Sequence, residues 1–163
     1  MKREWAERNT LSNRPPLFAL IIGINNYDNL RKLHGAVPDA KAVQEYLMDH
    51  LKVPEEQIRT LLDLKATREA IITTFQELRR DERIQENDPI LIYYAGHGGK
   101  IDAPRGWNSS GPNGKIEAIY SQDYAEQKVE PIPDRTIAAL LDRLAEEKGD
   151  NIVRLSLVLL EVI

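Results

Sequence analysis

The chain has 163 residues, of which 42% are hydrophobic and 29% charged, a composition typical of one globular domain with a hydrophobic core. Its net charge of −4 argues against nucleic acid as a partner, because nucleic-acid-binding proteins usually carry a basic excess. The sequence has no cysteine, so disulfides, thiolate metal sites and a thiol nucleophile within these residues are excluded.

The N-terminal segment, residues 1–16, is charged and polar and ends in two prolines. We expect a flexible arm here, followed by a single domain over residues 17–163. The arm lacks the apolar stretch of a secretory signal, and no apolar run in the chain reaches the roughly 18 residues of a membrane span. The expectation is therefore a cytoplasmic protein without a membrane partner.

The first half of the chain alternates strands and helices. Residues 17–24 form a continuous apolar run, which predicts a strand buried on both faces, and turn-forming residues 25–29 follow. A helix is expected over 38–51 and a second strand over 58–62. Thr67 is placed to cap the next helix, whose inner face carries Ile71, Phe75 and Leu78.

The second half repeats this alternation. A third strand is expected over 90–95, ending at Gly96-His97-Gly98-Gly99, and residues 100–121 predict a loop with a hairpin. Asp134 is placed to cap a third helix that Gly149 ends, and residues 151–163 predict a last strand. The order predicts an α/β fold with a mainly parallel sheet and helices on both faces.

Two polar clusters follow predicted strands, at 25–28 and at 96–99, where ligands bind in open parallel sheets. His97 can act as a general acid and base, and its glycine neighbours would let their N–H groups face a developing negative charge. A structural histidine with one hydrogen bond fits the same pattern, and the spacing leaves both readings open. Asp28, His34 and His97 show no metal-ligand spacing, so neither a metal nor a cofactor is expected.

The segment Tyr-Tyr-Ala-Gly-His-Gly at 93–98 resembles the caspase-like cysteine peptidases, among them the metacaspases. Segments 18–27, 33–40, 66–71 and 132–136 resemble the same family in the same order, so the resemblance covers roughly residues 17–152. It implies a three-layer caspase-like fold and a peptidase that acts on peptide or protein substrates. In this family a cysteine thiolate attacks a peptide carbonyl, and a histidine carries the proton.

The resemblance assigns roles to three residues of this chain. His97 matches the family's histidine, and Gly98 matches the residue whose N–H holds the oxyanion. Asp39 matches the aspartate that lines the metacaspase specificity pocket, where a buried carboxylate would favour Arg or Lys before the scissile bond. An acid in the first turn of a helix is the other reading of Asp39.

The resemblance stops after Ile152, where the family continues into Asp-x-Cys-His-Ser-Gly. This chain continues as an apolar run to Ile163, in which Ser156 reads as a strand residue rather than as a substitute nucleophile. We therefore expect the large-subunit portion of a cysteine endopeptidase that ends before its cysteine, either because the chain is a truncated fragment or because a frameshift or a retained intron changes the sequence after Ile152. It is expected to be inactive as written and incomplete in its C-terminal sheet. The uncovered apolar surface predicts self-association. The alternative is a non-catalytic caspase-like interaction module in a cell-death or regulatory assembly.

Overall fold

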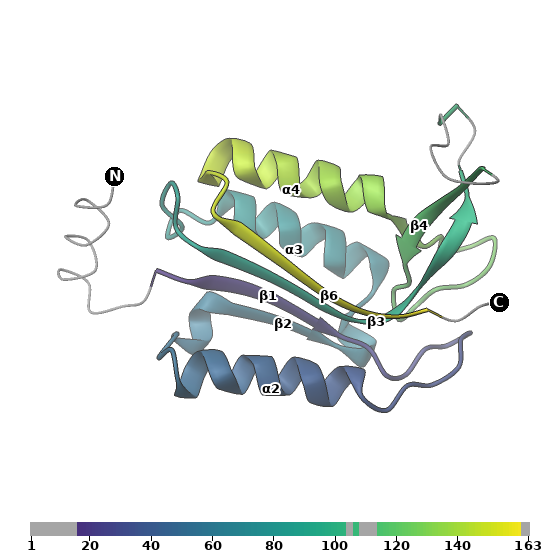
Figure 1. Ribbon diagram of the computed structural model, residues 1–163, viewed down its shortest axis with the longest axis horizontal. Helices are drawn as coiled ribbons and strands as arrows, with labels where there is room; N and C mark the ends of the chain where they lie inside the picture. Colours follow the sequence, from purple (N-terminus) through teal and green to yellow (C-terminus); the bar gives the residue numbers. More distant parts are fainter. Residues whose placement is uncertain (1–15, 104–105, 108–113, 161–163) are drawn as a thin grey trace.

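The computed structural model describes residues 16–103, 106–107 and 114–160. Within them, a mixed six-stranded sheet forms the middle layer (Figure 1), and five strands run in the order β2-β1-β3-β4-β5. The strands are β1 (Phe18–Gly23), β2 (Ile58–Leu62), β3 (Ile90–Asp102), β4 (Lys115–Ile119), β5 (Ile132–Pro133) and β6 (Ile152–Leu160). Pairs β1–β2, β1–β3 and β3–β6 are parallel, whereas β4 pairs antiparallel with β3 and β5.

Helices cover both faces of the sheet, as the sequence predicts. The helix α2 (Ala36–Asp49) lies on one face, and α3 (Arg68–Arg80) and α4 (Asp134–Lys148) lie side by side on the other (Figure 1). Because β1 is buried along its whole length, its side chains belong to two hydrophobic clusters, one on each face of the sheet. Short 3-10 turns, Glu55–Gln57 and Asp63–Lys65, flank β2.

Local signals explain most helix ends. The Thr67 hydroxyl oxygen accepts a hydrogen bond from the backbone N–H of Ala70 at 3.1 Å, which confirms its capping role. Gly149 follows α4 with a φ of 83°, which confirms the predicted end of that helix. The prediction that Asp134 caps α4 is wrong, because Pro133 holds the cap position and Asp134 is the first helical residue. The carboxylate of Asp134 instead pairs with Arg154 of β6 at 2.8 Å.

The predicted end of the third strand at residue 95 is also wrong. Strand β3 continues through Gly96, His97, Gly98 and Gly99 to Asp102. It changes partner on one side as it does so: β1 pairs with it up to Ala95, and the antiparallel β4 takes over from Gly98. The glycine-rich segment therefore lies inside a strand rather than in a turn, and the predicted hairpin is the one formed by β3 and β4.

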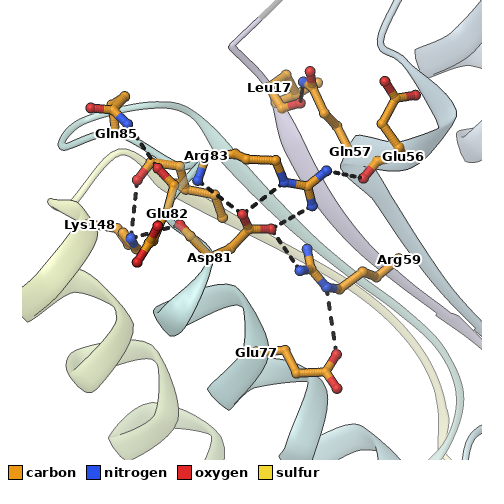
Figure 2. A network of polar contacts seen from close by, with 11 residues as sticks. Leu17, Glu56, Gln57, Arg59, Glu77, Asp81, Glu82, Arg83, Gln85 and Lys148 are labelled. Atoms are coloured by element: carbon orange, nitrogen blue, oxygen red, sulfur yellow. Dashed lines mark hydrogen bonds and ion pairs between the residues drawn. The ribbon is translucent and has the colours of Figure 1, made fainter.

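A polar network ties the elements together at the amino end of the parallel strands (Figure 2). The Asp81 side chain, 7% exposed, accepts hydrogen bonds from Arg59 of β2 at 2.8 Å and from Arg83 at 2.7 Å. Hydrogen bonding to Arg83, together with that to Arg59, holds the pKa of the Asp81 carboxyl well below its usual range. Lys148 at the end of α4 donates to the backbone carbonyl of Asp81 at 2.9 Å, so the network joins β2, α3 and α4.

Strand β6 has one apolar face that none of the described helices covers. Val153, Leu155 and Leu157 alternate along it and are 51–52% exposed. Helix α2 packs mainly on β1 and β3 on that side of the sheet, and β6 itself pairs only with β3 among the described strands.

None of the helices that the structure describes is both long enough and apolar enough to cross a bilayer. The predicted flexible arm lies, for residues 1–15, outside the described residues.

Candidate functional site

The candidate site lies where β1 and β3 reach their carboxyl ends. The loop after β1 folds over this end of the sheet and meets His97 of β3. The backbone N–H of His97 donates to the Tyr27 hydroxyl at 2.8 Å, and the Tyr27 and His97 rings lie 4.8 Å apart between centroids, tilted by 52°. The two polar clusters predicted from the sequence therefore come together in space.

The His97 imidazole is buried, with 2% of the residue exposed, and its Nε2 lies 2.7 Å from the backbone carbonyl oxygen of Arg31. A carbonyl oxygen can only accept a hydrogen bond, so this contact requires a proton on Nε2. In the neutral ring Nδ1 then carries the lone pair. The arrangement assigns Nδ1 as the ring nitrogen able to take a proton.

Tyrosine hydroxyls fix the backbone around His97. The Tyr94 hydroxyl lies 2.7 Å from the His97 carbonyl oxygen and 3.0 Å from that of Tyr120. Burial raises the pKa of Tyr27 to about 12, against the opposing effect of its hydrogen bond to the His97 backbone. Burial also raises the pKa of Tyr94. Both hydroxyls therefore stay neutral at ordinary pH.

Gly96 makes room for this tyrosine pair. A Cβ at position 96 would come within 2.5 Å of the Tyr27 hydroxyl and 2.6 Å of the Tyr94 hydroxyl. Real Cβ atoms do not approach oxygen atoms so closely, so a side chain here would push the two hydroxyls away from the His97 backbone. The glycine before His97 thus serves the close packing that holds the histidine.

Asp63, at the carboxyl end of β2, anchors the loop that supplies the Arg31 carbonyl. One carboxylate oxygen of Asp63 accepts from the backbone N–H groups of Asn25 and Asn26 at 2.7 and 2.8 Å. The side chain of Asn25 then accepts from the backbone N–H of Val37, and its carbonyl accepts from Leu33. These bonds fix both ends of the segment that carries Arg31.

Sequence reasoning missed Tyr27, Arg31 and Asp63 as parts of the site. Asp63 had a usable signal, because it is an acid directly after a strand whose carboxyl end lies at the predicted site. Arg31 had none, since it contributes a backbone carbonyl that every residue type carries.

Gly98, the predicted oxyanion donor, lies between two strands. It is in register with Ile119 of β4 on one side and with Leu160 of β6 on the other. A Cβ at this position would collide with the side chain of Val158, so β6 passes directly against the backbone of Gly98. The close approach explains why a glycine is needed here.

Asp39 lies in the first turn of α2 and is exposed, so the buried carboxylate expected for a specificity pocket is not what the structure has. Burial, and to a smaller extent the charge of Asp39, raises the pKa of Tyr93. No hydrogen bond or ion pair joins Asp39 to His97. The site therefore brings His97 and Gly98 together in one strand, with Asp39 on the neighbouring helix.

Ser156 does not share a face with His97. It is in register with Tyr94, three positions before His97, and side chains alternate along strands, so the two residues point to opposite faces. Its hydroxyl instead accepts from Arg154 Nε at 3.3 Å. Ser156 is thus not placed to pass its proton to the imidazole, and the sequence has no cysteine.

A metal centre has no support among the described residues, where no three His, Asp or Glu side chains gather around one point. Of the three residues considered from the sequence, Asp28 accepts a hydrogen bond from Gln122 at 2.9 Å, and His97 Nε2 is engaged by Arg31. His34 is exposed.

Curated relatives of the chain include fungal metacaspases. It is 30% identical over 131 residues to metacaspase-1 of Scheffersomyces stipitis, which covers 77% of this chain and 31% of the relative. It is 32% identical over 112 residues to metacaspase-1A of Neurospora crassa, covering 65% of this chain and 24% of the relative. The chain thus spans about a quarter to a third of the length of these relatives.

Solved structures show the same fold at lower identity. A Geobacter sulfurreducens protein superposes with a TM-score of 0.65 at 20% identity, covering 88% of this chain and 50% of the other. The Drosophila initiator caspase Dronc superposes with a TM-score of 0.59 at 16% identity, covering 89% and 49%.

The predicted caspase-like α/β fold is therefore confirmed. The sequence profile of the caspase domain matches residues 17–148, which is most of the chain. By this match the chain belongs to the caspase-domain family of peptidases, and within that family it is similar to the metacaspases.

Proposed function

We propose that residues 17–163 are the histidine-bearing part of a cysteine-type endopeptidase domain, and that a cysteine outside these 163 residues completes the site. The observation that carries the proposal is the 2.7 Å contact between His97 Nε2 and the Arg31 carbonyl, which leaves Nδ1 as the base. A merely structural histidine needs only one such bond, but it does not need to sit at the carboxyl end of the central strands.

The proposed chemistry is acyl transfer. His97 Nδ1 takes the proton of the cysteine thiol, and the thiolate attacks the carbonyl carbon of the scissile peptide bond. In a product whose residues after Ile152 differ from those of β6, the Gly98 N–H donates to the oxygen that becomes negatively charged. As the C–N bond breaks, His97 returns the proton to the leaving amine, and water then hydrolyses the thioester.

Asp39 is the proposed specificity residue. Its exposed carboxylate at the start of α2 would pair with an Arg or Lys side chain before the scissile bond. Exposure makes this pairing weaker than in a buried pocket, so the preference for basic residues is expected to be modest as long as no further segment covers Asp39. No metal or cofactor takes part in the proposed reaction.

The gene sequence gives the first test. The region beyond the codon for Ile152 is translated in all three frames and searched for Asp-x-Cys-His-Ser-Gly. We expect the motif in one frame, and no turnover of Arg- or Lys-containing peptides by the 163-residue chain. A stop in every frame without the motif would rule out the peptidase proposal. If the 163-residue chain cleaves such peptides and His97→Ala abolishes that cleavage, the chain does not need the missing thiol for activity.

A second candidate is a non-catalytic interaction module, which the exposed apolar face of β6 favours. Under either function we propose that β6 binds a second copy of the chain, through its apolar face and through the edge that no described strand pairs with. A cytoplasmic location and a role in a cell-death or regulatory assembly stay predictions, and imaging of the tagged protein in its own cells tests the first.

A further inference from the structure

A groove runs along the junction of α3 and α4, on the face of the sheet opposite α2. Its larger hollow, about 580 Å³, is bounded at one end by Gly106 and Trp107 and by the first turn of α4. A smaller hollow of about 100 Å³ continues it toward the C-terminal end of α3. Gln76, Leu140 and Arg143 line both hollows, so they form one continuous groove. No residue of the proposed peptidase site lines it.

The walls of this groove are basic. Arg135 and Arg143 of α4 line the larger hollow, and Arg79, Arg80 and Arg143 line the smaller one. Among the described residues, no Asp or Glu lines either hollow, although the whole chain carries a net charge of −4. Such a concentration of one charge in a hollow raises the local concentration of oppositely charged groups.

The arginines differ in how they are already engaged. Arg79 pairs with Glu147 at 3.5 Å, and the Arg135 guanidinium lies over the Trp107 ring at 5.5 Å from its centroid. Within the described part of the chain, neither Arg80 nor Arg143 has an ion pair. Because Arg143 lies at the junction of the two hollows, it is the central positive charge of the groove.

The floor of the groove is apolar. Ile72, Ala139 and Leu140 line the larger hollow, and Phe75 with Leu140 lines the smaller. A basic rim above an apolar floor fits a ligand that alternates acidic and apolar groups. In an extended peptide, successive side chains point to opposite sides, so an apolar residue can enter the floor while its acidic neighbours face the rim.

The dimensions fit a short peptide. The stretch of α3 from Ile72 to Arg79 spans about 10 Å at the helical rise per residue, which is the length of about three extended residues. Of the parts of the chain that the structure does not describe, residues 1–15 hold four basic and two acidic residues, residues 104–105 and 108–113 hold no acid, and residues 161–163 hold one. Charge complementarity to the basic walls favours an acidic segment from outside these 163 residues over the net basic N-terminal residues of the chain.

We propose that the α3–α4 groove is a docking site for an acidic peptide segment from outside these 163 residues, with carboxylates paired to Arg143 and Arg80 and an apolar side chain on Ile72 and Leu140. The site recruits a substrate or partner protein through a segment remote from any scissile bond. It does not depend on the proposed peptidase function, because no catalytic group takes part.

A fluorescein-labelled peptide with a Glu-Leu-Glu core, titrated with the chain and followed by fluorescence anisotropy, tests the proposal. We expect saturable binding that weakens as salt is added, and at least tenfold weaker binding of the Gln-Leu-Gln peptide. Arg143→Gln should weaken binding about tenfold, and the double variant with Arg80→Gln more. Lys41→Gln, which removes the same charge from exposed α2 on the opposite face, should change it less than twofold.

Trp107 provides a second readout. In a Trp5→Phe background its emission is the only tryptophan signal, and it should change with the same affinity as the anisotropy. Three results would each overturn the proposal: no saturable binding of the Glu-Leu-Glu peptide, equal weakening by Lys41→Gln and Arg143→Gln, or displacement by free glutamate or phosphate at the peptide's own affinity. Tighter binding of a single-stranded oligonucleotide of equal charge would assign the groove to nucleic acid instead.

Discussion

At the scale of single residues, the structure fixes the orientation of the His97 imidazole, which the sequence left open. The sequence showed only that a histidine lies between glycines near a predicted strand end. The Arg31 carbonyl adds the orientation, because it engages Nε2 and leaves Nδ1 free of that contact. Backbone carbonyls of this kind have no sequence signature, so this part of the site was beyond prediction.

The orientation predicts one tautomer. When the His97 imidazole is neutral, nitrogen-15 NMR should show its proton on Nε2 and none on Nδ1. His34 and His50 are exposed and serve as internal references in the same spectrum, and His97→Gln assigns the His97 signals. A neutral His97 with its proton on Nδ1 would contradict the hydrogen bond to Arg31 and with it the proposed base.

Tyr27→Phe should destabilise the fold. The change leaves the buried backbone N–H of His97 without an acceptor, a loss of about 1–3 kcal/mol in the free energy of unfolding. Urea denaturation measures it, with Tyr46→Phe as the matched control, because Tyr46 is 55% exposed on α2. Equal stability of the wild type and Tyr27→Phe would show that the tyrosine hydroxyl does not hold the His97 backbone.

The same variant tests a pH dependence. Burial raises the pKa of Tyr27 in the folded protein from 10 to about 12, so the folded state binds this proton more tightly than the unfolded state. The stabilisation from Tyr27 is therefore complete below pH 10 and is lost as the pH rises toward 12. The stability of the wild type should fall more steeply over this range than that of Tyr27→Phe.

At the scale of elements, the sequence predicted what hydrophobic periodicity and caps encode. The continuous apolar run correctly predicted β1. The start of α3 was predicted from Thr67, and its inner face from Ile71, Phe75 and Leu78. Sequence-based prediction failed where partners distant in the chain determine the local structure. Gly-His-Gly-Gly looks like a turn, yet β4 and β6 supply strand partners on both sides of Gly98.

The start of α4 was mispredicted for a similar reason. Asp134 is a good capping residue by type, but Arg154 of β6 offers its carboxylate a charged partner at 2.8 Å. Pro133 takes the cap position with an extended backbone. A long-range ion pair of this kind leaves no trace in a local sequence pattern.

The Asp81 network should anchor the C-terminal end of α3. Asp81→Asn removes a largely buried negative charge that two arginines share (Figure 2), and we expect a loss of about 2 kcal/mol at pH 7. Glu77→Gln is the control. Glu77 is 58% exposed and lies 3.8 Å from the same Arg59, so its removal should cost less than about 0.5 kcal/mol.

The difference between Asp81→Asn and the wild type should depend on pH. Because the folded pKa of Asp81 is depressed, its stabilisation is present above the unfolded value and is lost as the pH falls below it. The two proteins should therefore converge in stability as the pH falls below about 4. A difference that stays constant from pH 7 to pH 3 would mean that the carboxylate charge is not what Arg59 and Arg83 stabilise.

At the scale of the whole molecule, the sheet leaves β6 as its exposed apolar element. Val153, Leu155 and Leu157 share one face, and β6 has one strand partner among the described residues. Such an edge is a template for pairing with another chain. The wild type should sediment with a concentration-dependent mass, and Leu155→Lys should shift it to a monomer.

The control for this prediction is Leu64→Lys. Leu64 is 76% exposed in the turn after β2, away from β6, so the substitution adds the same charge to a different surface. A wild type that stays monomeric at high concentration, or a Leu64→Lys protein that dissociates as Leu155→Lys does, would contradict self-association through the β6 face.

The central claim is that His97 is the base of a cysteine-peptidase site whose nucleophile lies outside these residues. The most direct test is kcat/KM for an Arg-containing peptide. It is measured on the longer protein encoded by the reading frame that continues from Ile152 into the Asp-x-Cys-His-Ser-Gly motif. The claim predicts turnover by that longer protein, a loss of at least about a thousandfold in His97→Ala, and little change in the exposed His50→Ala control. Turnover that survives His97→Ala would contradict it.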